Sequence, residues 1–239
     1  MKNEVVKKET TNAVAAYTPA DMADWGAAPI DAKDIVIPRI NLAQQMSENV
    51  IAGKAKMGEY YESSGLNVIG GVGKPLDIIP FMLEQIWIVQ KKVAGKADKF
   101  EFDKIEQVTP ENKLLPWDFI EDGVQKKRVF TRNFYCLVDG QTLPCIISFA
   151  GSSSKAGKHL ATIMYAENKL SNLPPSAYHI LLDAKIDKND DGTFAVKTVV
   201  KGKESTKEEV ARTLEWFKTF KTVAPKVQDE NFGAANGDF

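Results

Sequence analysis

The sequence is poor in the residues from which catalytic and metal sites are usually built. Its 239 residues include two cysteines, Cys136 and Cys145, and two histidines, His159 and His179. Neither pair has the close spacing of zinc ligands, and no serine or cysteine is placed with a histidine as in a nucleophilic triad. We therefore expect no enzymatic activity, no metal and no other cofactor.

The sequence also lacks long apolar stretches. It contains no run of 18 apolar residues, and its N-terminus has no apolar leader segment. These absences predict a cytoplasmic protein with no membrane partner. In that compartment Cys136 and Cys145 are expected to be free core thiols, although a bridge across their predicted hairpin is geometrically conceivable.

Neither sign of charge dominates, with 31 basic and 32 acidic side chains in the chain. The acidic residues are concentrated toward the two ends, so that residues 35–223 carry 26 basic and 23 acidic side chains. A mildly basic body is compatible with a polyanionic ligand but does not require one.

Three segments approach known ligand-binding motifs and fail. Segment 70–75 has Pro75 where a phosphate-binding loop needs Ser or Thr, and segment 151–159 has the wrong glycine spacing. Segment 187–198 begins like a calcium-binding loop but ends on Thr198, where a bidentate carboxylate is required. We interpret all three as turns or helix starts.

Short alternating runs separated by turn residues predict a mainly antiparallel α+β fold. We expect hairpins around residues 64–65, around Asp139-Gly140 and around residues 188–192, with helices over 38–46, 152–170 and 205–223. The last helix is predicted to begin with a capping box of Ser205 and Glu208. Strands in this number suit an OB-like barrel with two or three helices.

The domain boundaries follow from composition. Residues 1–33 are small, polar and aperiodic, and predict a mobile N-terminal arm. Residues 34–223 form the single predicted domain. Residues 224–239 predict a disordered acidic tail.

A basic and aromatic cluster lies on one predicted strand, over residues 126–135. Alternation along a strand puts Arg128, Phe130, Arg132 and Phe134 on the same face. Cations that contact phosphates, next to rings that stack on bases, are typical of proteins that bind single strands without sequence preference. The alternative is that Phe130 and Phe134 are core residues with the cations around them.

A second cluster adds lysines and hydroxyl groups at a predicted helix N-terminus, over residues 152–159, where backbone phosphates bind readily. The predicted DNA contacts in both clusters are Lys126, Lys127, Arg128, Phe130, Arg132, Phe134, Lys155 and Lys158.

The C-terminal residues have the composition of a tethered peptide ligand. They end on Gly237-Asp238-Phe239, with further acidic residues at Asp229 and Glu230. An acidic, apolar chain end can be captured by a basic, apolar pocket of a partner. We therefore predict that Asp229, Glu230, Asp238 and Phe239 bind partner proteins, the alternative being an ordinary frayed end.

This chain end resembles that of single-stranded DNA-binding proteins of bacteria and of short-tailed phages, whose acidic tails finish on Phe. The segments 37–40, 53–58 and 148–158 also resemble a widespread tailed-phage protein. The resemblance to the phage-type single-stranded DNA-binding family implies an OB fold and a tail that recruits replication and repair enzymes.

The predicted function is therefore that of a phage protein that protects and organises single-stranded DNA during replication and recombination, in the cytoplasm of the host cell. Its expected partners are the DNA itself, replication or recombination enzymes, and further copies of the chain. One alternative is a recombination protein that anneals strands. Another is a structural or host-interaction protein that binds no DNA.

Overall fold

The computed structural model describes residues 36–63, 67–95, 100–141, 143–190 and 192–222, and the backbone of 226–227. The predicted N-terminal arm (1–33) and residues 228–239 of the predicted tail lie outside the described residues. In chain order the elements are β1 (Val36–Ile37), β2 (Arg39–Leu42), α2 (Glu48–Ile51), β3 (Glu59–Glu62), β4 (Val68–Gly71), β5 (Leu76–Lys92), β6 (Phe100–Gln107), β7 (Asp118–Glu121), β8 (Val124–Val138), β9 (Cys145–Phe149), the 3-10 turn η2 (Gly151–Ser153), α3 (Ser154–Lys169), β10 (Tyr178–Asn189), β11 (Gly192–Glu204), α4 (Lys207–Thr222) and β12 (Lys226–Val227).

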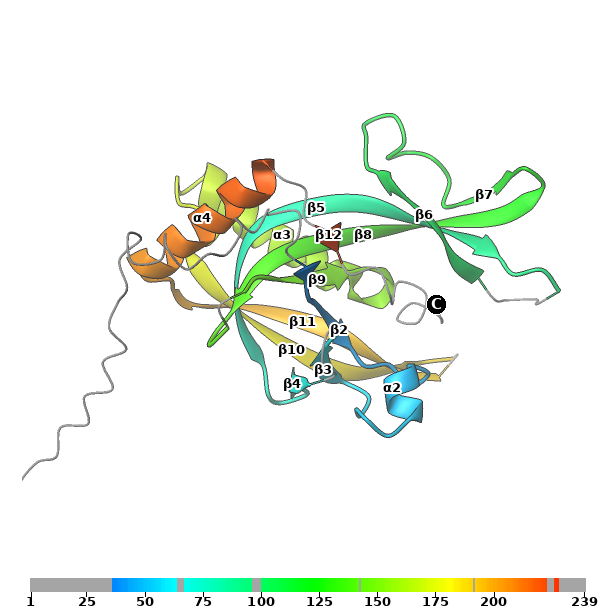
Figure 1. The fold of residues 1–239 in the computed structure, drawn as a ribbon, viewed down its shortest axis with the longest axis horizontal. Coiled ribbons are helices and arrows are strands. Elements are labelled where there is room, and N and C mark those ends of the chain that lie inside the picture. The colour runs from blue at the N-terminus through cyan, green and yellow to red at the C-terminus, as the bar shows by residue number, and fades with distance from the viewer. Residues whose placement is uncertain are drawn as a thin grey trace, which may run out of the picture. The chain divides into compact units, whose positions relative to one another are not determined.

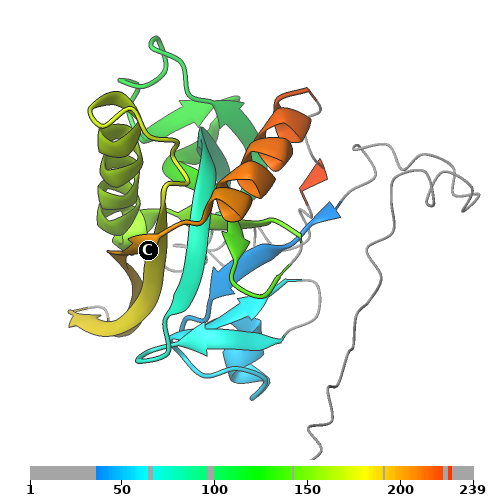
Figure 2. The same cartoon turned by 90° about the vertical axis from the view of Figure 1, so that its left-hand side faces the viewer.

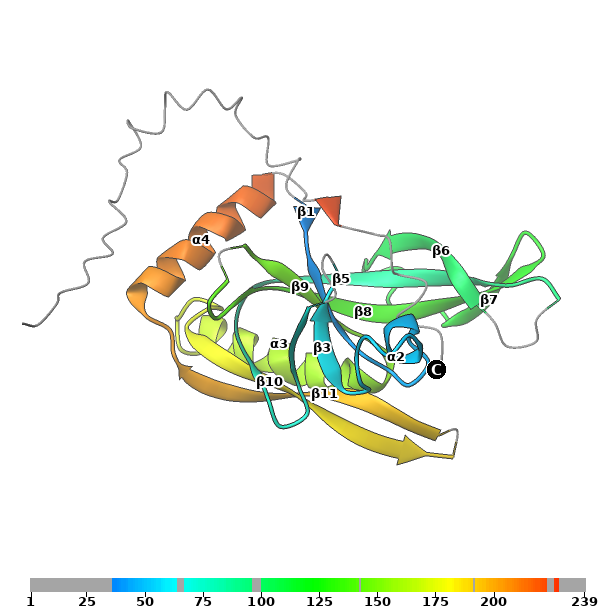
Figure 3. The same cartoon turned by 60° about the horizontal axis from the view of Figure 1, so that its bottom comes forward.

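Most of the described strands belong to one ten-stranded sheet. Its order is β11-β10-β5-β8-β9-β2-β3-β4, with β6 beside β5 and β7 beside β8. Every pair in this sheet is antiparallel except β2 with β9. The sheet curls into a half-barrel (Figures 1 and 3), which confirms a barrel-like, mainly antiparallel α+β fold.

The long strands β5 and β8 each contribute to two parts of the molecule. They pair with one another from Ile78 and Val138 to Lys91 and Lys126. At one end they lie between β10 and β9 in the half-barrel. At the other end they lie between β6 and β7 and extend away from the half-barrel (Figure 1). We call this four-stranded extension, made of residues 86–92, β6, β7 and 124–130, the arm.

The two faces of the sheet are covered by different helices (Figure 2). On the inner face, α3 packs Leu160 and Met164 into the main core around Phe134 and Phe149. On the outer face, α4 packs Phe220 onto a second cluster. This division follows from strand alternation, because successive residues of β8 and β5 point to opposite faces.

The side chain of Gln44, which follows β2, forms hydrogen bonds with β11. The Gln44 amide donates to the carbonyl of Ala195 and accepts from its N–H, both at 2.9 Å. It therefore pairs with the backbone N–H and carbonyl of Ala195 on the outer edge of β11, as a neighbouring strand would.

Most predicted elements are confirmed, including the hairpins, α3 and α4. The helix predicted over 38–46 is wrong: β2 forms there instead, because Arg39 and Ile40 pair with β9. The capping box is shifted by one residue, since the Thr206 hydroxyl accepts from the Glu209 N–H and the Glu209 carboxylate accepts from the Thr206 N–H. Cys136 and Cys145 face each other in register as free, buried thiols, as expected.

Candidate nucleic-acid interface

The arm carries part of the predicted basic cluster, but acidic side chains neutralise it. Lys126 Nζ lies 2.7 Å from Asp103 Oδ2 and 2.6 Å from Glu121 Oε2. The hydrogen bond from Lys126 lowers the pKa of both carboxyls, and the two carboxylates in turn raise the pKa of Lys126. The ammonium is therefore held within the arm.

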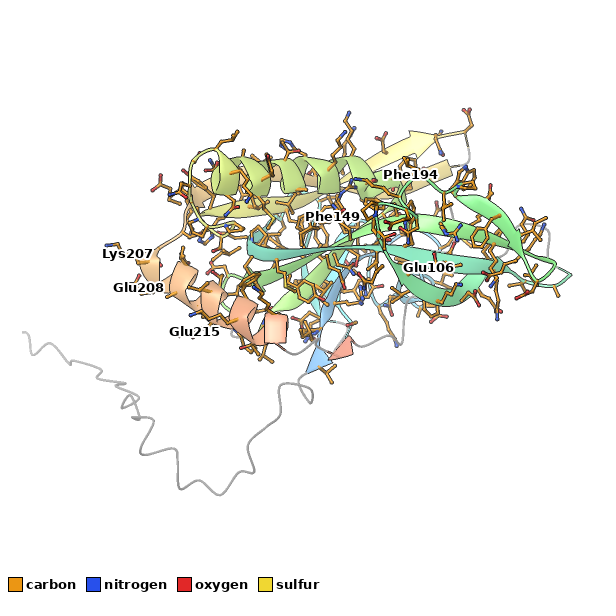
Figure 4. All side chains as sticks on the ribbon, turned by 90° about the horizontal axis from the view of Figure 1, so that it is seen from above. Glu106, Phe149, Phe194, Lys207, Glu208 and Glu215 are labelled. Carbon is orange, nitrogen blue, oxygen red and sulfur yellow. The ribbon has the colours of Figure 1, made fainter. Side chains whose placement is uncertain are left out.

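Arg128 is held in the same way. Its Nε donates to Glu106 Oε2 at 3.1 Å, and its guanidinium lies 3.7 Å from the centre of the Phe119 ring. Figure 4 labels Glu106 on the arm. Burial alone would raise the pKa of Glu106, but the hydrogen bonds from Arg128 and Lys104 keep it below its ordinary value. Only 10% of the Arg128 side chain is exposed, so its charge stabilises the arm and is not free to meet a phosphate.

Lys127 points to the opposite face of the arm. Its ammonium lies 4.0 Å from the centre of the Phe100 ring and 5.7 Å from that of Trp117. No carboxylate pairs with it among the described residues. Alternation along β8 thus separates Lys127 from Arg128, as the sequence pattern predicted.

The two predicted stacking rings have different surroundings. Phe134 is fully buried, 5.3 Å from Phe149 in the main core, so the prediction that it stacks on a base is corrected. The core alternative holds for this residue. Phe130 is partly buried and meets Trp87 edge-on at 5.2 Å.

Arg132 lies on the same face of β8 as Arg128, but where the arm joins the half-barrel. Its guanidinium lies 4.5 Å from the centre of the Phe130 ring, and Nη1 donates to Ser154 Oγ at 3.3 Å. The Nε atom is buried and has no hydrogen-bond partner within the described residues. Burial lowers the pKa of Arg132, although an arginine remains a cation at any physiological pH.

Ser154 is the first residue of α3, and the local sequence provides this helix N-terminus with neither a capping side chain nor an acidic residue. The chain turns from β9 into η2 at Gly151, whose φ of 48° is a left-handed conformation that suits glycine. No side chain caps either η2 or α3, and the first turn of α3 contains no acidic residue. The predicted contacts Lys155 and Lys158 are both exposed in the first turns of α3.

Gly157 determines how closely α3 approaches the sheet. A Cβ at this position would lie 2.5 Å from the Phe149 Cβ, closer than real atoms approach. The helix N-terminus therefore sits against β9 and beside Arg132, and any larger residue would move it outward.

Lys197 of β11 reaches the same place, and sequence reasoning missed it. Its backbone N–H donates to Ser153 Oγ at 3.1 Å, and its side-chain ammonium lies 5.6 Å from the centre of the Phe149 ring. No carboxylate pairs with it in the described part of the chain, and burial lowers its pKa to about 8. Phe149 and Phe194, labelled in Figure 4, locate this region. The available signal was alternation, since Lys197 stands between the buried Ala195 and Val199.

These residues form one basic site, which we call the α3 site. It consists of the N-terminus of α3, with Ser153 and Ser154, and of Arg132 and Lys197, which have no acidic partner among the described residues. The amides of Ser153 and Ser154 already donate to the carbonyls of Ala150 and Gly151, so such a site can bind an oxyanion through the hydroxyls, the two cations and the positive end of the helix dipole. The predicted partner-binding residues Asp229, Glu230, Asp238 and Phe239 lie outside the described residues.

Comparison with known proteins identifies the family. No curated protein and no solved structure matches the chain. No helix among the described residues is long and apolar enough to cross a membrane. The profile of the Pam3 phage gp34-like protein family matches residues 7–231, which is nearly the whole sequence. The chain is therefore a member of the Pam3 phage gp34-like family.

Proposed function

We propose that the protein binds single-stranded DNA of the phage through the α3 site. The observation that carries this proposal is the meeting of Arg132 and Lys197 with the uncapped N-terminus of α3. Two cations without acidic partners and an open helix end favour a phosphate group over a neutral ligand.

The order of the strands supports an oligonucleotide as the ligand. Apart from the arm strands β6 and β7, which lie between β5 and β8, the elements follow in the order β5, β8, β9, α3, β10 and β11, and β5 also pairs with β10. An OB barrel has the same succession of three strands, a helix and a hairpin, and binds oligonucleotides on the face of its second and third strands. The corresponding strands are β8 and β9, where Arg132 and Phe149 pair.

Membership of a phage family supports a role with phage DNA. In this role the protein protects and organises single strands during replication or recombination. Its C-terminal residues recruit partner enzymes, as their resemblance to acidic tails implies. This proposed role involves binding alone, so it requires no enzymatic activity of the protein.

The test is a titration of fluorescently labelled oligo(dT), and of a duplex, followed by anisotropy at several salt concentrations. We expect the wild type to prefer the single strand. The variant Arg132→Ala/Lys197→Ala should bind more weakly, with a salt slope smaller by about 0.7 for each phosphate that the variant no longer binds.

The matched control is Lys207→Ala, which removes a lysine from the start of α4 on the other face of the sheet (Figure 4). It should bind like the wild type. Absence of oligonucleotide binding at low salt would contradict the proposed function. A normal salt slope in the double variant would instead place the DNA elsewhere on the protein.

A further inference from the structure

The arm exposes a group of large apolar side chains just before and within β7. Leu114 is 90% exposed, Ile120 76% and Trp117 62%. Single exposed apolar residues are common, but several within seven positions of one another usually indicate a contact surface.

The backbone at Trp117 is fixed, although its ring is exposed. The Trp117 carbonyl accepts from the Arg128 N–H at 2.6 Å, which extends the ladder between β7 and β8 by one residue. The ring is therefore presented from a hydrogen-bonded position, and its ordering costs little when a ligand binds.

Trp117 lies along the same edge of β8 as the α3 site, with its ring on the Lys127 face and Arg132 on the opposite face, so a ligand that reaches both passes around this edge. Trp117 is hydrogen-bonded to Arg128, and Phe149, just before η2 and α3, pairs with Arg132. These two positions on β8 are four residues apart, or about 13 Å along the strand. A few nucleotides of an extended single strand can bridge that interval.

The chemistry around Trp117 suits a nucleotide. The Lys127 ammonium lies 5.7 Å from the centre of its ring, and no acidic partner of this lysine exists within the described residues. An exposed ring supplies a stacking surface for a base, and a neighbouring free cation supplies a phosphate contact. A purely apolar partner would leave the Lys127 charge uncompensated.

We propose that Trp117 is a base-stacking contact, and that a bound single strand runs along the edge of β8 from the α3 site to Trp117. This inference rests on the proposed function. It assigns phosphate binding to the half-barrel and base binding to the arm. A duplex, whose bases already stack on each other, cannot use Trp117 in this way, so the arm adds preference for single strands.

The experiment compares Trp117→Ala, Trp117→Phe and the control Leu170→Ala, which removes a comparably exposed apolar side chain at the C-terminal end of α3, on two ligands. The ligands are oligo(dT) and an abasic phosphodiester of the same length. We expect Trp117→Ala to weaken oligo(dT) binding about 5- to 150-fold, the range for removal of one stacked base. Trp117→Phe should keep most of the affinity, Leu170→Ala should bind normally, and abasic binding should be the same for all variants.

The possible outcomes distinguish a failure of this inference from a failure of the proposed function. If the wild type binds oligo(dT) and Trp117→Ala binds it equally well, the inference is wrong and the proposed function stands. If Trp117→Ala weakens abasic binding as much as oligo(dT) binding, Trp117 does not stack on bases. If the wild type binds no oligonucleotide, both proposals fail.

A sedimentation measurement without DNA tests the other possible occupant, a second copy of the chain. We expect the wild type and Trp117→Ala to have the same mass. A lower mass for Trp117→Ala would show that Trp117 serves self-association, which would overturn the inference.

Discussion

Two basic clusters lie along β8, and they differ in their partners more than in their residue types. In the arm, Lys126 and Arg128 are paired with Asp103, Glu106 and Glu121. At the α3 site, Arg132 and Lys197 meet hydroxyl groups, aromatic rings and a helix N-terminus, with no carboxylate among the described residues.

The difference shows why a count of cations does not locate a binding site. Ion pairs cancel the field that would attract a phosphate, and the paired side chains are held in place by their partners. A cation that is partly buried without an acidic partner costs stability, and an anionic ligand relieves that cost. The less stabilised cluster is thus the better candidate for binding.

The largest expected effect is the difference in stability between alanine variants of Phe134 and Phe130, two rings on the same face of β8. Phe134→Ala should destabilise the fold by about 3–5 kcal/mol, because it empties a fully buried position. Phe130→Ala should cost only about 1–2 kcal/mol, since this ring is partly exposed and lies at the arm, in contact with Trp87 and Arg132. Urea unfolding of both variants measures the difference. Equal losses would mean that the arm is as tightly packed as the half-barrel.

The next prediction compares alanine variants of the two arginines of β8, Arg128 and Arg132. Arg128→Ala should lose about 1.5–3 kcal/mol of stability, because it breaks a charge-assisted hydrogen bond and leaves the partly buried Glu106 with Lys104 alone. It should leave the salt slope of oligonucleotide binding unchanged. Arg132→Ala should do the reverse, with a slope smaller by about 0.7 and little loss of stability. The same effect of both variants on the slope would remove the distinction between the clusters.

The pH dependence of binding should sharpen the comparison further. Burial lowers the pKa of Lys197 from 10.5 to about 8, so the unfolded chain holds more protons between those values and folding stability rises with pH across that window. A bound phosphate favours the charged ammonium and raises this pKa again.

Affinity for oligo(dT) should therefore fall about tenfold between pH 7 and pH 9.5 as the free protein loses this proton. Anisotropy titrations across this range measure the fall. Lys197→Arg is the matched variant, because arginine stays charged throughout and should bind with little pH dependence. A fall of the same size in Lys197→Arg would assign the proton to another group.

The smallest expected effect comes from the edge of the arm. Glu121→Gln removes one of the two acidic partners of Lys126 and should lower the stability of the fold only slightly, because Glu121 is partly exposed and Asp103 remains. Oligonucleotide binding should be unchanged. Clearly tighter binding would mean that the arm acids restrain a cation that can reach DNA.

Local patterns predicted much of the fold. The turn at Asp139-Gly140 and the alternation of β8 are visible within a few residues, and both the hairpin and the division of its faces are confirmed. Residues 39–42 were mispredicted because their strand conformation depends on pairing with β9, more than a hundred residues away. Helix propensity cannot register such a partner.

The site was predicted only in part for the same reason. Arg132, Lys155 and Lys158 could be selected from composition, but the acids that neutralise Lys126 and Arg128 come mainly from β6 and become neighbours only in the sheet. Phe134 could not be assigned from the sequence, because alternation determines the face of a strand and not what covers it. Lys197 was overlooked although its position between two apolar inward residues marks it as unusual.

The pairing of Gln44 with Ala195 also constrains the order of folding. The two residues are 151 positions apart, and the bond joins an early segment to the last hairpin. During synthesis, Gln44 leaves the ribosome long before Ala195 is made, so its side-chain amide lacks this partner until the hairpin of β10 and β11 has emerged. Closing so long a loop is entropically costly and is repaid only when the hairpin has formed. A nascent chain that stops before β11 consequently leaves one edge of β10 unpaired and available for pairing with other chains.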